Sequence, residues 1–244
     1  MSKRLLDLLV SFGGLVLASP VLLPVMFLVW WQDRHSPFYV ASRVGLDQRP
    51  FRMVKLRSMR IGADRSGVDS TSAGDSRITP VGHFIRRYKL DELTQLWNVL
   101  IGDMSLVGPR PNVERETRLY TDLEQRLLTV KPGITDYASI VFADEGEILQ
   151  GQADPDLAYN QLIRPWKSRL GLFYIERRSL ALDLKLVLLT AVTILSREKA
   201  LRAVAQDLER RSAPPELVRI AQRRDRLVPH PPPGASSVVT SRAA

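Results

Sequence analysis

The chain has 244 residues, a formal net charge of +9 and no cysteine. This length suits one domain of ordinary size with a tail, and the lack of cysteine excludes disulfides, thiolate nucleophiles and cysteine-ligated zinc. The positive charge indicates an anionic partner. Because no nucleic-acid-binding motif accompanies the basic residues, we expect membrane lipids or a phosphorylated substrate as partners, and no nucleic acid.

An uncharged apolar stretch runs from Leu8 to Trp31, and Ser19-Pro20 and Pro24 interrupt it. A bilayer core about 30 Å thick needs about 20 apolar helical residues, so this stretch is long enough to enter a membrane. Lys and Arg on both sides favour a re-entrant hairpin with both ends on the cytoplasmic side. A kinked transmembrane helix is the alternative. A cleaved signal peptide fits less well, because the run is too long and no small-residue cleavage site follows.

The next segments predict a hairpin, a loop and a helix. Residues 38–60 contain two short apolar runs around a turn, which is typical of a β-hairpin. Residues 61–82 are rich in Gly, Ser, Asp and Thr, and we expect a mobile loop. Apolar residues at three- and four-residue spacing predict a helix over residues 90–101, and the glycines and prolines of residues 102–111 end it.

The second half of the chain is predicted to be mainly helical. Residues 112–129 predict a charged amphipathic helix, residues 134–142 a strand because they are β-branched and aromatic, and residues 154–211 a largely helical region. The apolar run at residues 184–195 is too short to span a membrane, so it is either a core helix or a helix in the membrane interface. The basic, proline-rich tail from residue 213 is expected to be disordered at its end.

Together these elements predict a mainly helical α+β protein with a small β element and interfacial amphipathic helices. Residues 1–36 are expected to form a membrane-embedded helix-break-helix hairpin in which Ser19-Pro20 makes the break, with the Ser19 hydroxyl bonding a carbonyl freed by Pro20 or simply packing among apolar residues. Residues 37–212 are expected to form the globular domain, and residues 213–244 the tail.

The clearest candidate for chemistry is the pair Asp91-Glu92, which begins a predicted helix directly after a basic stretch. Acidic residues in the first turn also stabilise a helix, so a capping role is one interpretation. The other is a carboxylate nucleophile or metal-binding pair beside cations that hold phosphate oxygens. Gln95 and Asn98 share the polar helix face of this pair by their spacing, so we include them among the candidate phosphate- or substrate-binding residues. Arg110 follows in the stiff sequence Gly-Pro-Arg-Pro, where its guanidinium could hold a phosphate through two hydrogen bonds.

These motifs carry a family resemblance. The stretches RPFRMVKLRSM, RITPVGHFIRRYKLDELTQLWNVLIGDMSLVGPRP and KPGIT resemble the bacterial sugar transferase family, the monotopic phosphoglycosyl transferases. The similarity runs from about Lys3 to about Leu195 and includes the Ser-Pro break. Two small departures are Thr94, where the family usually has proline, and KLRSM in place of KFRTM. Neither departure removes a charged group.

The resemblance implies transfer of a sugar 1-phosphate from a UDP-sugar to a polyprenyl phosphate, an early step of exopolysaccharide, capsule, O-antigen or other glycan synthesis. It implies that Asp91 is the nucleophile and carries a covalent phosphosugar. Glu92 would help bind Mg²⁺, together with Asp91, or accept a proton. The site would lie at the cytoplasmic face of the bacterial inner membrane, in a monotopic protein.

The resemblance also assigns the basic positions. Lys55 and Arg110 match the family's phosphate-binding residues, while Arg86 and Arg87 either assist them or contact the membrane surface. A competing hypothesis is a non-catalytic membrane-anchored module that binds anionic lipid. The paired carboxylates among the cations argue against that module, because a lipid-binding surface has no use for them. The sequence leaves the transferred sugar and the oligomeric state open.

Overall fold

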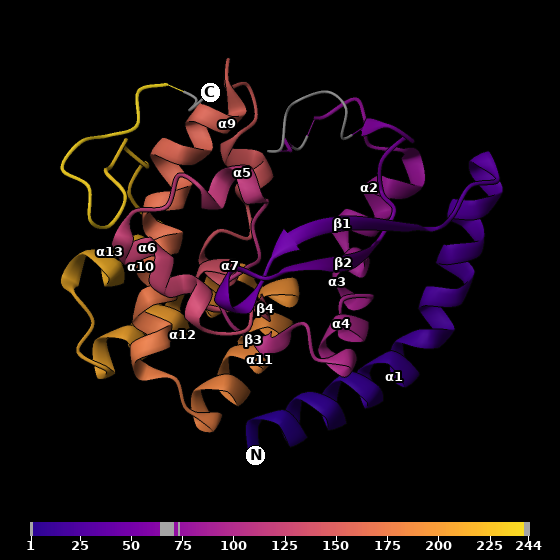
Figure 1. The fold of residues 1–244 in the computed structure, drawn as a ribbon, viewed down its shortest axis with the longest axis horizontal. Coiled ribbons are helices and arrows are strands. Elements are labelled where there is room, and N and C mark those ends of the chain that lie inside the picture. Colours follow the sequence, from indigo (N-terminus) through magenta and orange to yellow (C-terminus); the bar gives the residue numbers. More distant parts are fainter. Residues whose placement is uncertain (1, 64–70, 73, 242–244) are drawn as a thin grey trace.

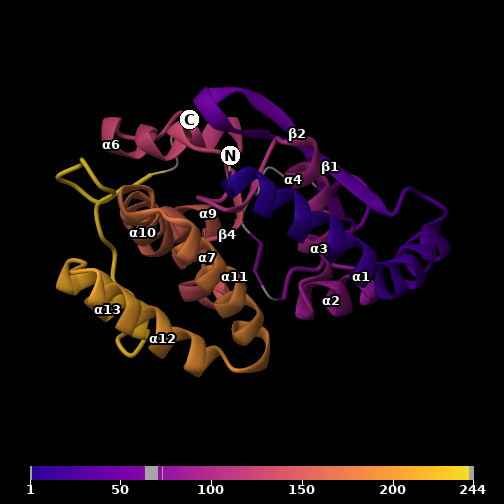
Figure 2. The ribbon, with the colours of Figure 1, turned by 90° about the horizontal axis from the view of Figure 1, so that it is seen from below.

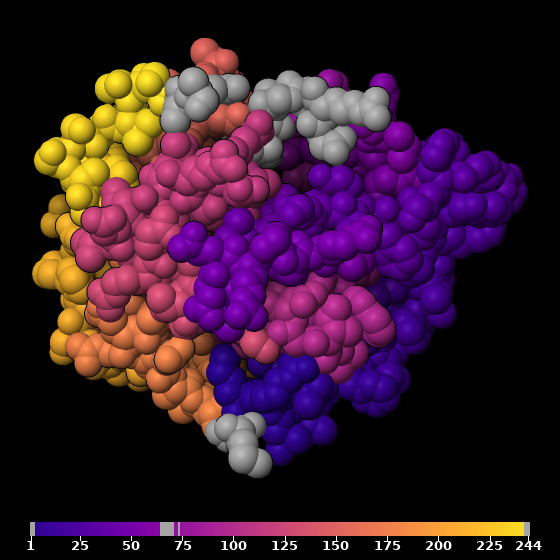
Figure 3. All heavy atoms as spheres, in the orientation of Figure 1, coloured from indigo at the N-terminus to yellow at the C-terminus, as the bar shows by residue number. Residues whose placement is uncertain are grey.

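The structure, a computed structural model, describes residues 2–63, 71–72 and 74–241. The long helix α1 (Ser2–Asp33) lies along one side of the molecule, and the hairpin β1 (Phe38–Val44) and β2 (Pro50–Leu56) crosses the front (Figure 1). Viewed from below, the late helices lie on the opposite side from α1 (Figure 2). The space-filling view shows the hairpin covering the centre, with the end of α1 and the start of β1 projecting to one side (Figure 3).

Helix α1 contains Pro20 and Pro24 without losing its helical assignment, and it changes direction part-way along its length (Figure 1). Pro20 has no N–H to donate to the carbonyl of Val16, four residues earlier. The Ser19 hydroxyl donates to that carbonyl instead, at 2.7 Å. This confirms the hydrogen bond predicted for Ser19, whereas the expected break is absent, because α1 continues through Ser19-Pro20 as one helix.

Polar contacts fasten the beginning of α1 to the globular domain. Lys3 forms an ion pair with Asp183 at 2.5 Å. The buried Asp7 accepts hydrogen bonds from the Ser105 hydroxyl at 2.9 Å and from the backbone N–H of Leu106 at 3.1 Å. The same domain therefore fixes the position of this helix end.

The other end of α1 is fastened just as firmly. Arg57, which follows β2 and is buried, donates to both carboxylate oxygens of Asp33 at 2.5 and 2.7 Å. Between the two ends, α1 exposes many apolar side chains, including Phe12, Leu17 and Leu23. By length and composition, α1 could cross a membrane.

The predicted β-hairpin is confirmed. Strands β1 and β2 pair antiparallel from Phe38↔Leu56 to Val44↔Pro50, joined through the short 3-10 turn η1 (Leu46–Gln48). Part of the loop predicted for residues 61–82 lies outside the described residues, namely 64–70 and 73. Its predicted end is wrong, because helix α2 (Pro80–Arg87) already begins there, where the Thr79 hydroxyl accepts a hydrogen bond from the N–H of Gly82 at 2.9 Å.

The helix predicted over residues 90–101 is present as two pieces, α3 (Leu90–Leu93) and α4 (Leu96–Ile101). The backbone N–H groups of Gln95 and Trp97 bond carbonyls three residues back, which tightens the turn between the pieces. The hydroxyl of Thr94 donates to the carbonyls of Asp91 and, on β2, Val54. Thr94 thus holds α3 against β2.

The amphipathic helix predicted over residues 112–129 is wrong. The segment forms α5 (Glu114–Thr117), α6 (Asp122–Gln125) and the 3-10 turn η3 (Arg126–Thr129). A capping box explains the interruption: the Thr121 hydroxyl accepts from the N–H of Glu124, and the Glu124 carboxylate accepts from the N–H of Thr121. A new helix starts at this box, so the preceding one cannot continue.

The strand predicted over residues 134–142 is also mostly wrong. Only its first residues belong to β4 (Gly133–Thr135), which pairs parallel with β3 (Ser105–Val107). Helix α7 (Tyr137–Val141) follows because the Asp136 carboxylate accepts hydrogen bonds from the N–H and the hydroxyl of Ser139, both at 2.7 Å. This N-cap outweighs the strand propensity of the residues behind it.

The prediction of a largely helical region over residues 154–211 is confirmed. The helices of this half are α8 (Glu145–Ile148), α9 (Pro155–Ala158), the π-helical turn η4 (Tyr159–Ile163), α10 (Arg164–Arg177), α11 (Leu180–Leu195), α12 (Arg197–Arg210) and α13 (Pro215–Gln222). One face of helix α11 packs into the core, as the core interpretation of its apolar run predicts, and the membrane-interface interpretation stays a prediction. Leu182 and Leu186 are buried in the core, whereas Leu188 and Leu195 are 67% and 87% exposed.

The predicted tail begins with a further helix. Helix α13, near the start of the tail, buries Leu217, Val218 and Ala221 against the core. The chain then runs back over α10 up to residue 241, and residues 242–244 lie outside the described residues (Figure 1).

Candidate active site

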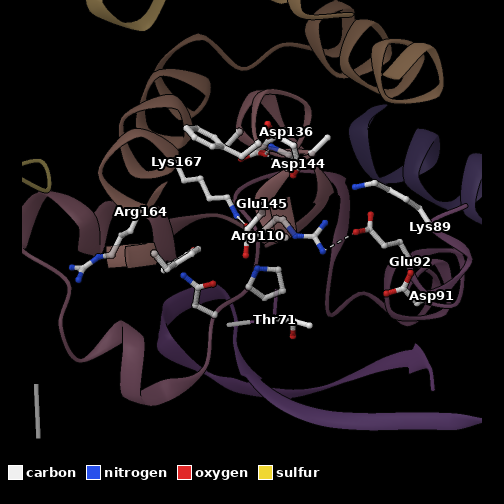
Figure 4. Close-up of a pocket in the computed structure, with 18 of the residues that line it drawn as sticks. Thr71, Lys89, Asp91, Glu92, Arg110, Asp136, Asp144, Glu145, Arg164 and Lys167 are labelled. Carbon is white, nitrogen blue, oxygen red and sulfur yellow. Dashed lines mark hydrogen bonds and ion pairs between the residues drawn. The ribbon is translucent and has the colours of Figure 1, made fainter. Parts of the chain in front are cut away.

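A cavity of about 670 Å³ lies between the two halves of the molecule. One wall comes from β2, α2 and α3. The other comes from the loop after β3 and from residues 136–147 and 159–168 (Figure 4). Acidic and basic side chains face each other across it, among them Lys55, Asp91, Glu92, Arg110, Glu145 and Lys167.

The predicted pair Asp91 and Glu92 lines this cavity from the first turn of α3. The residue before the helix, Lys89, has a left-handed backbone (φ 53°), which turns the chain sharply between α2 and α3. A non-glycine residue in this region stores strain of order 1 kcal/mol or more. The side chain of Lys89 makes no capping hydrogen bond to α3, so helix capping alone does not explain the sharp turn between α2 and α3.

The two carboxylates have different environments. Burial raises the pKa of Asp91 above its ordinary value, and the positive charge of Lys55 opposes this rise. Burial would also raise the pKa of Glu92, but Arg110, Lys89 and Lys55 together lower it to about 2. Among the described residues none donates a hydrogen bond to the Asp91 carboxylate, whereas Arg110 donates to Glu92 at 3.0 Å. Glu92 is therefore held by a hydrogen bond, while the Asp91 carboxylate is open, that is, without a hydrogen-bond donor in the described structure.

Arg110 lies at the centre of the cavity (Figure 4). Its guanidinium donates to Glu92 and, at 2.8 Å, to the backbone carbonyl of Ile134. The parallel pairing of β3 and β4 sets this position. A Cβ on Gly133 would lie 2.1 Å from the nitrogen of Gly108, and a Cβ on Gly108 would lie 2.5 Å from a carbonyl oxygen. Two glycines therefore permit the close backbone approach that aims Arg110.

The remaining predicted cations also line the cavity. Lys55 lies on β2 two residues after Met53, so both side chains point to the same face of the hairpin. Burial and the nearby Arg110 lower the pKa of Lys55 to about 8. Arg86 and Arg87, at the end of α2, complete the basic wall. Such a set of cations around an open carboxylate is suited to binding phosphate groups next to a nucleophile.

Comparison with known proteins agrees with this geometry. The model of the family described as bacterial sugar transferase matches residues 1–197. The chain belongs to the bacterial sugar transferase family. It is 36% identical over 195 residues to a Klebsiella pneumoniae protein named UDP-glucose:undecaprenyl-phosphate glucose-1-phosphate transferase, covering 77% of this chain and 39% of that protein.

Two further relatives span the same region. An Aeromonas hydrophila protein named UDP-N-acetylgalactosamine-undecaprenyl-phosphate N-acetylgalactosaminephosphotransferase is 33% identical over 203 residues, which are 80% of this chain and 44% of that protein. The uncharacterized sugar transferase EpsL of Bacillus subtilis is 35% identical over 196 residues, 80% of this chain and 88% of EpsL. The chain thus spans about two fifths of the Klebsiella and Aeromonas relatives but most of EpsL.

Two predicted substrate-binding residues of this family member lie outside the cavity wall. Asn98 is fully buried, accepts a hydrogen bond from the N–H of Val54 at 2.9 Å and donates to the carbonyl of Arg52 at 2.8 Å. Asn98 therefore joins α4 to β2. Gln95 is also fully buried, and its amide has no hydrogen-bond partner among the described residues. The tightened turn after α3 explains why both residues leave the face of Asp91.

Sequence reasoning missed the far wall of the cavity. Glu145 and Lys167 form an ion pair there, and the ammonium of Lys167 lies 5.3 Å from the ring centre of Tyr159. Buried Asp136 lies near this pair, and burial raises its pKa. No local motif marks these residues, because they come from separate elements that only the fold brings together.

The carboxylates fit a magnesium ion that arrives with a substrate. Among the described residues, no group of three His, Cys, Asp or Glu side chains could hold a metal by itself. Mg²⁺ is commonly bound by one or two carboxylates plus substrate phosphates and water. Asp91 has no hydrogen-bond partner in the described structure, and Glu92 uses only one oxygen toward Arg110. This donor set suits a shared ion and does not suit a closed protein cage.

Proposed function

We propose that this sugar transferase moves a sugar 1-phosphate from a UDP-sugar to undecaprenyl phosphate or a similar polyprenyl phosphate, at an early membrane step of bacterial glycan synthesis. The names of the relatives support the donor and acceptor classes. The observation that carries the proposal is the open carboxylate of Asp91, which faces a cavity lined by Lys55, Arg110 and Arg86.

In the first half-reaction, a carboxylate oxygen of Asp91 attacks the sugar-bearing phosphorus of the donor. The bond from that phosphorus to the bridging oxygen breaks, and UMP leaves with the electron pair. The free lone pairs of Asp91 support this assignment over Glu92, whose carboxylate Arg110 already engages. Lys55, Arg110, Arg86 and the neighbouring Arg87 hold the phosphate oxygens and stabilise the charge of the leaving group.

In the second half-reaction, a phosphate oxygen of the lipid attacks the same phosphorus and expels the Asp91 carboxylate. The product is a polyprenyl diphosphosugar, and the enzyme is regenerated. One site thus serves a soluble donor and a membrane acceptor in turn, which gives ping-pong kinetics. Asp91 and Glu92 would hold Mg²⁺ with the donor phosphates, and the ion would neutralise charge on the diphosphate.

We also propose that α1 enters the bilayer and returns, so that the protein is monotopic at the cytoplasmic face of the inner membrane. The fastening of both helix ends to one globular domain supports this topology. A spanning helix would put the Lys3–Asp183 and Arg57–Asp33 ion pairs on opposite sides of a core about 30 Å thick. The re-entrant arrangement keeps both pairs intact and sets Asp91 near the level of the lipid phosphate.

The reaction is tested by incubating the purified protein with Mg²⁺, a panel of UDP-sugars and undecaprenyl phosphate, and measuring UMP release. We expect release with at least one donor, and a phosphosugar adduct by intact mass spectrometry when the acceptor is omitted. Asp91→Asn should form no adduct. UMP release by Asp91→Asn at the rate of the parent protein would show that the nucleophile is another residue.

The topology is tested with single cysteines, which is straightforward because the natural chain contains none. Cysteines at Ser2 and Ser36 are labelled in inverted and right-side-out vesicles with a membrane-impermeant thiol reagent. We expect both sites to react only when the cytoplasmic face is outward. Labelling of the two sites from opposite faces contradicts the re-entrant proposal.

A further inference from the structure

The C-terminal segment from residue 213 lies beyond the matched family region, which ends at residue 197. Even so, it is tightly fitted to the molecule. After α13, the chain turns at Arg223, whose backbone is left-handed (φ 52°), and runs across the outside of η4 and α10. In the space-filling view, this segment (yellow) packs against the late helices at the upper left (Figure 3).

The segment contacts η4 and α10 through several hydrogen bonds and one pair of rings. The N–H of His230 donates to the carbonyl of Gln161 at 3.0 Å, and the Gln161 side chain donates to the carbonyl of Val239 at 2.7 Å. The ring of His230 lies 4.5 Å from that of Trp166. Arg169 donates to the carbonyl of Pro231 at 2.9 Å. These contacts clamp one face of the two helical elements.

The opposite face of the same elements is the far wall of the cavity. Tyr159, Arg164, Lys167 and Ser168 line the cavity. On a helix, positions 164, 167 and 168 lie opposite positions 166 and 169. The π-helical geometry of η4 is rare and needs support from its surroundings. The tail supplies that support at Gln161, in the middle of the turn.

A second contact reaches the wall from another direction. The Arg223 guanidinium donates to Asp144 at 2.9 Å and lies 5.2 Å from the ring centre of Phe142. Asp144 and Phe142 both line the cavity, and Asp144 precedes Glu145, the partner of Lys167. The side chain of Arg223 is only 9% exposed, so this ion pair is largely shielded from solvent.

We propose that residues 213–241 are a positioning segment of the donor site: Arg223 and His230 hold the wall formed by Asp144, Tyr159 and Lys167 against the bound UDP-sugar. The inference rests on the proposed function for the identity of the ligand, but the positioning itself does not. The segment touches the wall on the side away from Asp91, so it acts on donor binding and leaves the attacking carboxylate unchanged.

The test uses the full-length protein with Arg223→Gln and, as a milder variant, His230→Ala. Arg224→Gln is the matched control, because Arg224 is the exposed neighbour of Arg223. We expect both test variants to raise the KM for the UDP-sugar at least about fivefold, the lower end of typical coupling between sites. The KM for the polyprenyl phosphate and kcat should stay within about twofold, and Arg223→Lys should restore part of the donor affinity.

Amide hydrogen exchange over residues 155–170 provides a readout that needs no substrate. Faster exchange in Arg223→Gln and His230→Ala, but not in Arg224→Gln, supports the proposal. Unchanged exchange overturns it, and so does faster exchange with an unchanged donor KM. If the KM values for the donor and the acceptor rise equally and Tm falls, the segment contributes to folding alone, and this result also overturns the proposal. If the parent protein releases UMP from no UDP-sugar, the proposed function fails, and the exchange measurement still decides the positioning.

Discussion

The contact between Arg110 and Glu92 should control the charge of the catalytic pair. Arg110→Gln removes the guanidinium that binds the Glu92 carboxylate at 3.0 Å. The side chain of Glu92 is only 20% exposed, so water replaces this partner poorly. Burial favours the protonated form of Glu92, and Arg110 is the largest influence that opposes it. Without Arg110, the pKa of Glu92 should therefore rise from about 2 toward its ordinary value of 4.5, while Lys89 and Lys55 still favour the charged form.

The effect of Arg110→Gln on the rate has two parts. With a pKa no higher than about its ordinary value of 4.5, Glu92 stays charged at neutral pH, so the pKa change alone affects the rate only toward pH 5. The loss at neutral pH comes from the missing phosphate ligand, because a hydrogen bond to a charged group contributes about 1.5–3 kcal/mol, which corresponds to about 10- to 150-fold in rate. We therefore expect kcat/KM at neutral pH to fall by about 10- to 150-fold.

The assay is single-turnover UMP release between pH 5 and 8, with the donor that the parent uses. In Arg110→Gln, the rate should fall further toward pH 5, because Glu92 becomes partly protonated there. In the parent protein, Glu92 stays charged over the whole range and causes no such fall. The double variant Glu92→Gln/Arg110→Gln should lose little beyond the single variants, because the two residues act as a unit. Activity of Arg110→Gln within threefold of the parent over this range would refute the argument.

Three further changes test the fold and the site. Gly133→Ala should cost about 3 kcal/mol, measured by thermal unfolding in nanodiscs, because the new Cβ would lie 2.1 Å from the nitrogen of Gly108. Gly13→Ala is the control: it has open space around it and lies inside a helix, so it should cost nothing and can stabilise by up to about 1 kcal/mol. Asn98→Ala should lower stability by about 2 kcal/mol through loss of its buried hydrogen bonds, without a donor-specific rise in KM; a selective rise would restore its predicted role in binding. Donor affinity should fall as the pH rises through about 8, where Lys55 loses its charge, and be flat over this range in Lys55→Gln; equal pH profiles for parent and variant contradict this.

The predictions succeeded where the interactions join residues close together in the sequence, and failed where the folded backbone decides which interactions form. The hairpin over residues 38–60 was predictable because its turn and its paired strands are neighbours in sequence. The errors at residues 112–129 and 134–142 arose where a capping side chain competed with periodicity or strand propensity. Thr121 and Asp136 were visible in the sequence, but only the folded backbone shows that their side chains accept the capping hydrogen bonds.

By itself, the sequence determined the kinds of groups available: a long apolar helix with a Ser-Pro bend, and an Asp91-Glu92 pair among basic residues. The tertiary structure decided which carboxylate is held and which is open, because Arg110 reaches Glu92 only through the close parallel pairing around Gly108 and Gly133. The tertiary structure also brings together the cavity wall with Glu145 and Lys167 and packs residues 213–241 against it. These features depend on contacts between residues far apart in the chain, and local spacing carries no information about such distances.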